Sequence, residues 1–211
     1  MESTGPGTSG GAPEGTTPPP PPPPSNTWST PPPAPSAGPA GYYYADVPNR
    51  AIAYIIDVII IGIINIIILA VLGGIFGGGG IVDPVTGQLN FIATVVIAVV
   101  GLVISGAYFV YTWTSMRATI GMRLLGMQIG NETDGSTLTQ NQAITRWILL
   151  GAPFSLAQLL NPIPALGLII SLAGLVWLIA LLVTTAQSPT KQGLHDRYAH
   201  TVVVKAGRAA A

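Results

Sequence analysis

Three polar residues, Arg50, Asp57 and Asn65, lie within one long apolar stretch, residues 49–72. Their spacings are close to two helical turns each, so a helix would carry them along one side as a polar stripe. Asp57 would lie roughly 10 Å beyond Arg50 along the helix axis. A carboxylate at that depth in a membrane costs about 2–3 kcal/mol, so it should face protein or water. Two interpretations stay open: a binding site or ion pathway with Asp57 as its titratable group, or an interhelical contact that fixes the helices.

The C-terminal part of the chain supplies a second carboxylate, Asp196. The residues around it predict two helical turns, followed by a short β-branched strand at 201–204. That strand could pair with residues 127–129 in a small sheet, which makes Asp196 a candidate partner for Arg50 or Arg197. The hypothetical ligand or ion site therefore consists of Arg50, Asp57, Asn65 and Asp196.

No motif of catalysis, cofactor binding or metal binding accompanies these residues. The chain has no cysteine and two histidines, and it contains no Gly-rich phosphate loop, Gly-x-Ser-x-Gly elbow or His-Glu-x-x-His helix. We therefore expect no catalytic residues, no metal and no cofactor, and an enzyme is the least expected class. Because the formal net charge is zero, nucleic acid is not an expected partner.

The composition indicates a membrane protein whose main partner is the lipid bilayer. Hydrophobic residues make up 49% of the chain and charged residues 8%, against about 25% charged in soluble proteins. Apolar segments predict an all-α fold with four transmembrane helices and a small cytoplasmic strand element. The expected helices cover residues of about 50–72, 91–113, 144–160 and 165–183. The third segment is short and contains Pro153, so a re-entrant or interfacial helix is its alternative.

The second expected helix closes with aromatic residues and contains small ones. The aromatic residues stand where an interfacial belt would be, and the small ones would let a neighbouring helix approach closely. The first group is Tyr108, Phe109, Tyr111 and Trp113, and the second is Gly101, Ser105 and Gly106.

The basic residues favour four spans over three. With four spans, every lysine and arginine falls on one side of the membrane, which the positive-inside rule identifies as cytoplasmic. Three spans would put four of the eight on the other side. We therefore expect a multi-pass protein of the cell membrane with both termini in the cytoplasm. The eight residues are Arg50, Arg117, Arg123, Arg146, Lys191, Arg197, Lys205 and Arg208.

Residues 1–45 form a Pro- and Gly-rich segment that we expect to be a disordered cytoplasmic tail. Fourteen of the twenty prolines precede Ala45, including the run Pro18 to Pro24. Without an apolar period no core can form, and the proline run should be extended polyproline II. The tail is either a solvated spacer or a docking segment for a protein. The transmembrane domain would then span residues 46–205, with a short C-terminal tail at 206–211.

The segments that carry the polar residues resemble the RDD family of small bacterial multi-pass membrane proteins, which is named for one arginine and two aspartates. The matching segments are VPNRAIAYIIDVIIIG, RATIGMRLLGMQIG and QGLHDRYAHTVVV, with a basic residue, Arg146, between the second and third. The resemblance covers residues 47–205 and implies that the named residues are Arg50, Asp57 and Asp196. Met122 departs from the pattern, because relatives commonly carry lysine there.

Two functions from different classes follow. The resemblance implies transport, since sodium/proton exchange has been associated with some members, and the intramembrane Asp57 would bind the cation or proton. Four helices make a thin wall for a transporter, so this function requires a homo-oligomer. The alternative is a structural or regulatory membrane subunit that recruits a protein through its Pro-rich tail.

Overall fold

The computed structural model describes residues 37–76, 85–87, 91–160 and 164–208, together with Met1, Gly5 and Gly7. Four long helices dominate this part of the chain, and two short helices, a 3₁₀ turn and three strands complete it. The long helices are α1 (Val47–Phe76), α2 (Phe91–Ser115), α4 (Gln140–Leu160) and α5 (Pro164–Gln187). The short elements are η1 (Pro39–Gly41), β1 (Tyr42–Tyr44), α3 (Ile120–Leu124), β2 (Met127–Asn131), α6 (Leu194–Tyr198) and β3 (Thr201–Arg208).

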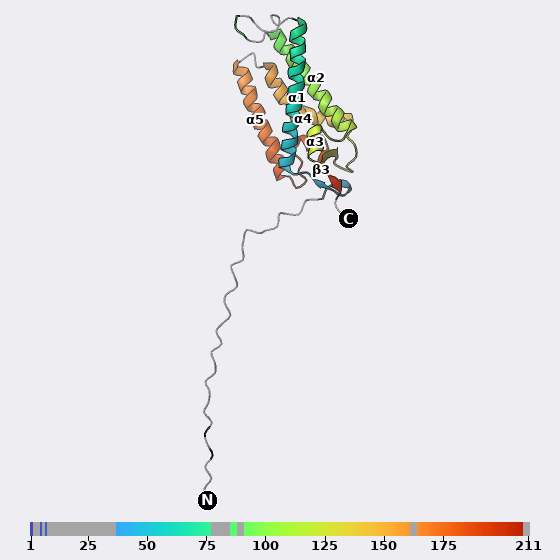
Figure 1. The fold of residues 1–211 in the computed structure, drawn as a ribbon, viewed down its shortest axis with the longest axis vertical. Helices are drawn as coiled ribbons and strands as arrows, with labels where there is room; N and C mark the ends of the chain where they lie inside the picture. Colours follow the sequence, from blue (N-terminus) through green and yellow to red (C-terminus); the bar gives the residue numbers. More distant parts are fainter. Residues whose placement is uncertain are drawn as a thin grey trace. The chain divides into compact units, whose positions relative to one another are not determined.

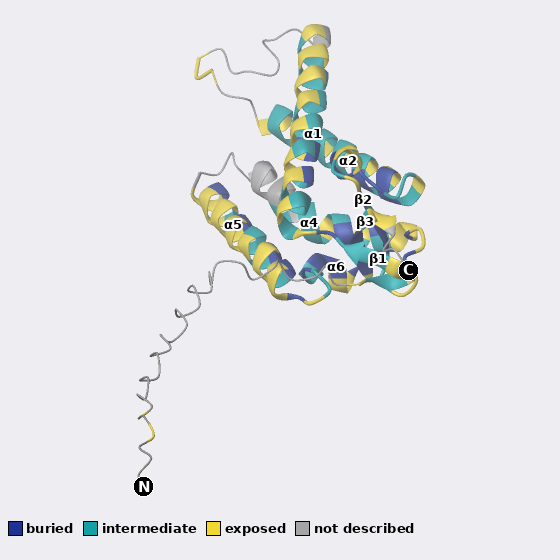
Figure 2. Ribbon diagram, turned by 60° about the horizontal axis from the view of Figure 1, so that its bottom comes forward, coloured by how far each residue is buried: buried dark blue, intermediate teal, exposed yellow. Residues whose placement is uncertain are grey.

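Three of the long helices are long and apolar enough to cross a membrane. They are Val47–Gly74 within α1, Phe91–Ser115 and Ala165–Gln187 within α5. Their outer faces expose isoleucine, leucine and valine along most of their length, as the exposed residues in Figure 2 show. Such surfaces are stable in lipid and not in water. The chain is therefore a mainly helical membrane protein, as its composition predicts.

Helix α4, the third expected span, is not among the candidates found in the described part of the chain. It begins at Gln140, four residues before the expected start, and its first two turns contain polar residues and Arg146. Pro153 lies inside the helix and does not divide it. Among the described helices, the expectation of four spans is therefore matched by three clear candidates and a fourth, more polar helix of similar length.

The three strands form one antiparallel sheet in the order β1-β3-β2. The pairing that the sequence predicts is present: Ile129 lies opposite Val203 and Gln128 opposite Val204. Strand β1 pairs with the other edge of β3, with Tyr44 opposite Val204. These tyrosines lie in the stretch that we expected to be tail, and the sheet holds them. Of the two expected tails, residues 2–4, 6, 8–36 and 209–211 lie outside the described residues. Residues 206–208, expected to belong to the C-terminal tail, are part of β3.

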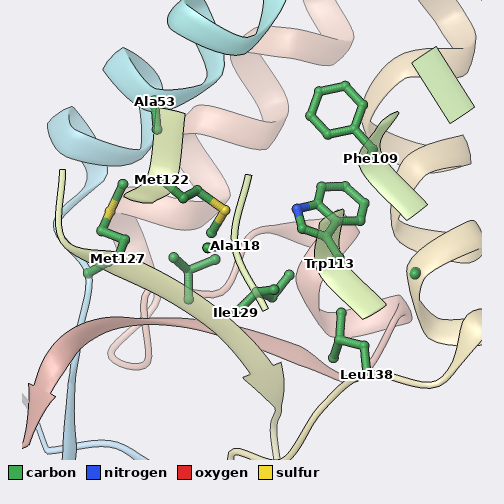
Figure 3. Packing of buried hydrophobic residues seen from close by; sticks show 11 residues of the cluster. Ala53, Phe109, Trp113, Ala118, Met122, Met127, Ile129 and Leu138 are labelled. Carbon is green, nitrogen blue, oxygen red and sulfur yellow. The ribbon is translucent and has the colours of Figure 1, made fainter. Parts of the chain in front are cut away.

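The hydrophobic core lies where the long helices meet the sheet, and we call this the sheet end of the protein (Figure 1). Figure 3 shows Phe109 and Trp113 of α2 facing methionines and aliphatic side chains from α3 and β2. Trp113 and Ile129 are almost completely buried. A core of this kind is built by burying apolar surface between elements that are far apart in the sequence. It fixes the sheet end as a rigid frame for the polar residues beside it.

Candidate functional site

Asp196 lies at the centre of a buried ion cluster at the sheet end. Its carboxylate is completely buried and binds both Arg50 of α1 and Arg146 of α4. Arg50 donates to Oδ2 of Asp196 and also to the backbone carbonyl of Lys191. Arg146 donates to Oδ1 and, at 2.8 Å, to the hydroxyl of Thr201. One carboxylate therefore joins α1, α4, α6 and the start of β3.

The local fold around α6 sets the direction of this carboxylate. Asp196 is the third residue of the helix, and its Oδ2 accepts a hydrogen bond from the backbone N–H of Gly193 at 3.1 Å. This contact satisfies one of the free N–H groups at the helix start. Gly193 is required there, because a Cβ atom would lie 2.3 Å from the hydroxyl oxygen of Thr185 on α5. The close approach of α6 to α5 thus holds Asp196 against the two arginines.

The ion cluster contains more positive than negative charge. Two guanidinium groups share one carboxylate, and Arg146 also lies over the ring of Trp113, 5.1 Å from its centroid, in a cation–π contact. His195 contributes no charge, because burial and the nearby Arg146 and Arg50 hold its pKa well below the ordinary value of 6.5. Its Nε2 lies 3.4 Å from Oδ2 of Asp196, close enough for a neutral ring to contact the carboxylate. Among the described residues, the two arginines are therefore the charged partners of Asp196.

Asp57 lies in a second, separate network. It is 2% exposed and accepts three hydrogen bonds from uncharged groups. The donors are the hydroxyl of Tyr108 on α2 at 2.6 Å, the hydroxyl of Thr119 at 2.5 Å and the backbone N–H of Gly121 at 2.9 Å. Among the described residues, no lysine or arginine forms an ion pair with Asp57. It is a buried carboxylate that protein dipoles hold without a counter-charge.

Helix α3 is positioned to serve this carboxylate. Thr119 caps α3, because its hydroxyl also accepts from the N–H of Met122 at 3.1 Å. Gly121 packs so closely on α1 that a Cβ atom would lie 2.2 Å from the carbonyl oxygen of Ala53. Only glycine allows the backbone N–H to reach Asp57 at this point. The network therefore joins α1, α2 and α3 through one side chain.

Asn65 belongs to neither network. Its side-chain amide donates to the carbonyl of Ile61 in the same helix at 2.9 Å. Its oxygen lies against α2, where a Cβ atom on Gly101 would be 3.3 Å from it. The described contacts of Asn65 thus satisfy its own helix and pack it on a neighbour.

The structure places the expected site residues as follows. Arg50 and Asp196 are paired, whereas Asp57 and Asn65 lie further along α1, and no contact among the described residues joins either of them to Arg50. One expected cluster is therefore two clusters in succession along α1. The sequence interpretation also missed three contributors: Arg146, which looked like a topology signal, and the hydroxyls of Tyr108 and Thr119. Threonine is a preferred residue directly before the first turn of a helix, and this capping signal could have pointed to Thr119.

Within the described part of the chain there is no group of three or more histidine, cysteine, aspartate or glutamate side chains that could hold a metal ion. What the site offers is a pair of buried carboxylates at different depths, one neutralised by arginines and one held by neutral donors.

Comparison with known proteins gives one match. The model of the RDD family matches residues 44–200, which is more than half of the chain and includes every residue of the two networks except Thr201. No curated protein and no solved structure matches.

Proposed function

Because the chain belongs to the RDD family, whose members are membrane proteins, we propose that it is a four-pass protein of the cell membrane that transports a cation or small solute, with Asp57 as the binding group. Sodium/proton exchange is the form of transport that we propose first. The protein would act without catalytic residues or a cofactor.

The sheet supports the four-pass arrangement. Strand β1 precedes α1, β2 lies between α2 and α4, and β3 follows α5, yet all three belong to one sheet. The start of α1, the end of α2 and the end of α5 must therefore lie on the same side of the membrane. Helix α5 is long and apolar enough to span. With α5 across the membrane, it starts on the opposite side, and we infer that α4 crosses to reach it.

Contacts in the middle of α4 agree with this. The indole N–H of Trp147 donates to Ser105 of α2 at 3.1 Å, and that of Trp177 on α5 donates to the carbonyl of Leu149 at 2.7 Å. Ser105 and Trp177 both lie ten residues from the sheet end of their helices, which is about 15 Å into the span. With four passes, all lysines and arginines gather on the sheet side, so we propose that this side, with both termini, is cytoplasmic.

The observation that carries the transport proposal is the missing counter-charge at Asp57. Burying an isolated carboxylate costs several kcal/mol, and the three hydrogen bonds that offset this cost come from neutral groups. A bound cation or a proton would supply the positive charge that these donors lack. A group of this kind inside a membrane is typical of a proton or ion relay. The ion cluster at Asp196 would close the cytoplasmic end of the proposed ion pathway while Asp57 binds a proton or a cation.

A proteoliposome flux assay tests this proposal. We expect the wild-type protein to exchange protons for sodium, and Asp57→Asn, which keeps the size and loses the titratable group, to lose most of that flux. Asp134→Asn, which removes an exposed carboxylate from a surface turn, should retain it. Chemical cross-linking in the same vesicles should reveal a homo-oligomer. Full flux in a folded Asp57→Asn protein would refute the ion-site proposal.

The second candidate, a structural or regulatory subunit, is favoured by the saturation of both aspartates. Asp196 is bound by two arginines, and every oxygen of Asp57 accepts a hydrogen bond, so both could serve only to staple helices. Strand β1 would then tether the Pro-rich segment to the sheet and present it to a partner protein. No flux for any cation, monomers on cross-linking, and capture of a defined protein that depends on residues 1–36 would support this candidate.

A further inference from the structure

The exposed face of α3 has a composition that water does not favour. Helix α3 buries Gly121 and Met122 and turns Ile120, Arg123 and Leu124 outward. Ile120 is 41% exposed and Leu124 is 69% exposed. These three residues have the i, i+3, i+4 spacing of one helix face, so the exposed side of α3 is an apolar face with a single arginine.

The position of α3 places this face at the edge of the membrane. On α1, its contacts are Ala53 and Asp57, which lie roughly 5 and 10 Å beyond Arg50 along the helix. On α2, the N–H of Ile120 donates to the hydroxyl of Tyr108 at 3.2 Å, seven residues before the helix ends at Ser115. Both helices are long and apolar enough to span, so α3 lies roughly two to three turns inside their sheet ends. Between Tyr108 and that end, Tyr111 is 66% exposed, as is typical of the headgroup level.

Arg123 lacks a partner in the described part of the chain. Its side chain is exposed, and no described residue forms an ion pair or a side-chain hydrogen bond with it. The described carboxylates have other partners: Asp46 contacts Lys205, Glu132 contacts His200, Asp134 accepts from the N–H of Ser136, and Asp57 and Asp196 lie in their own networks. An arginine flanked by lipid-facing residues extends its guanidinium toward the phosphates. Charge complementarity therefore points to a phospholipid and not to another apolar surface.

We propose that the outer face of α3 is embedded in the adjoining leaflet and that Arg123 binds the phosphate of an anionic lipid. Ile120 and Leu124 lie among the upper parts of the acyl chains, and the guanidinium reaches back to the headgroup. Thr119, which caps α3, and Gly121 in α3 both donate hydrogen bonds to Asp57. Helix α3 would therefore contact the lipid on one side and the buried carboxylate on the other. The headgroup composition of that leaflet then influences how tightly α3 is held against α1.

A fluorescence experiment tests the embedding. The chain has no cysteine, so Leu124→Cys gives a single attachment point for an environment-sensitive dye. In phosphatidylcholine vesicles whose acyl chains carry bromine near the headgroup, we expect strong quenching of this dye. Ile59→Cys, on the exposed side of α1, is the control within the span, and Thr133→Cys, in the exposed polar turn after β2, is the control in water.

The result at Leu124 can overturn the proposal in two ways. Quenching by aqueous iodide and not by bromine, as at Thr133, would mean that α3 lies in water. Protection from both quenchers would mean that protein, such as a second copy of the chain, covers this face. Quenching by bromine at a level between the two controls or above them supports the embedding.

A second measurement tests the lipid phosphate. The full-length protein is purified from vesicles of equal phosphatidylcholine and phosphatidylglycerol, and the lipids that remain bound are counted by mass spectrometry. We expect Arg123→Gln to reduce the retained phosphatidylglycerol about fivefold, and Arg123→Lys to restore most of it. Lys205→Gln, which removes the same charge from the sheet, should have no effect. Equal retention in Arg123→Gln and wild type would overturn the proposal.

Discussion

Asp196 is the residue on which the sheet end depends most. Two arginines share its single negative charge, and Asn at this position would keep its shape but leave both of them without a carboxylate partner. Removing one partner of a buried ion pair costs about 3–5 kcal/mol. We expect Asp196→Asn to lower the thermal unfolding midpoint strongly in detergent, whereas Asp134→Asn, at an exposed turn, should leave it unchanged. An unaltered midpoint in Asp196→Asn would contradict a stapling role.

His195 makes stability depend on pH. Its pKa is lowered in the folded protein by burial and by the nearby arginines. The folded state thus disfavours the protonated ring, while the unfolded chain takes up a proton near pH 6.5. Stability is therefore fully present above that pH and falls as the pH drops below about 6.5.

Thermal unfolding between about pH 8 and pH 5 measures this effect. We expect the wild-type midpoint to fall toward pH 5 and His195→Gln to show a flatter profile. The groups that face His195 and set this behaviour are Arg146, Arg50 and Asp196. A profile of His195→Gln as steep as that of the wild type would assign the pH dependence to other groups.

At the scale of elements, the close packing of α3 against α1 depends on Gly121. A Cβ at Gly121 would lie 2.2 Å from a backbone oxygen of Ala53, so α3 would have to move away and Asp57 would lose a donor. Overpacking of this kind costs about 1–3 kcal/mol. We expect Gly121→Ala to lose stability, measured by thermal unfolding in detergent.

The matched control is Gly62→Ala in α1, where a Cβ meets nothing within 4 Å. Alanine in a helix interior is favoured over glycine by about 0.5–1 kcal/mol, so this variant should be equally or more stable. If the two variants behaved alike, the contact between α3 and α1 would not be the tight one described.

At the scale of the whole molecule, the sheet makes a prediction about sidedness. A membrane-impermeant maleimide applied to intact cells should label Val85→Cys, between α1 and α2, and Ala165→Cys, at the start of α5. Thr133→Cys, beside β2, should react only after the membrane is opened. In a three-span protein with α4 lying on the cytoplasmic surface, Ala165→Cys would not react in intact cells. Labelling of Ala165→Cys therefore separates the two topologies.

The sequence by itself determined what depends on local chemistry. Long apolar runs must form helices in lipid, because every backbone polar group needs a partner there. β-branched residues after Asp196 predicted β3, and the position of a carboxylate in an apolar run marked Asp57 as a residue that protein must enclose. The pairing of Arg50 with Asp196, 146 positions apart, was also within reach, because few carboxylates lie on that side.

The tertiary structure alone decided which groups share a partner. Trp113 looked like an interfacial aromatic, but it is buried beneath Arg146. Tyr42 to Tyr44 were expected to belong to the disordered tail, but they form a strand. Arg50, Asp57 and Asp196 were expected to form one site, but Arg50 binds Asp196 of α6 whereas Asp57 accepts a hydrogen bond from α3. The physical reason is the same in each case: a side chain's burial and charge balance depend on elements that pack beside it from distant parts of the chain, and no local pattern encodes that packing.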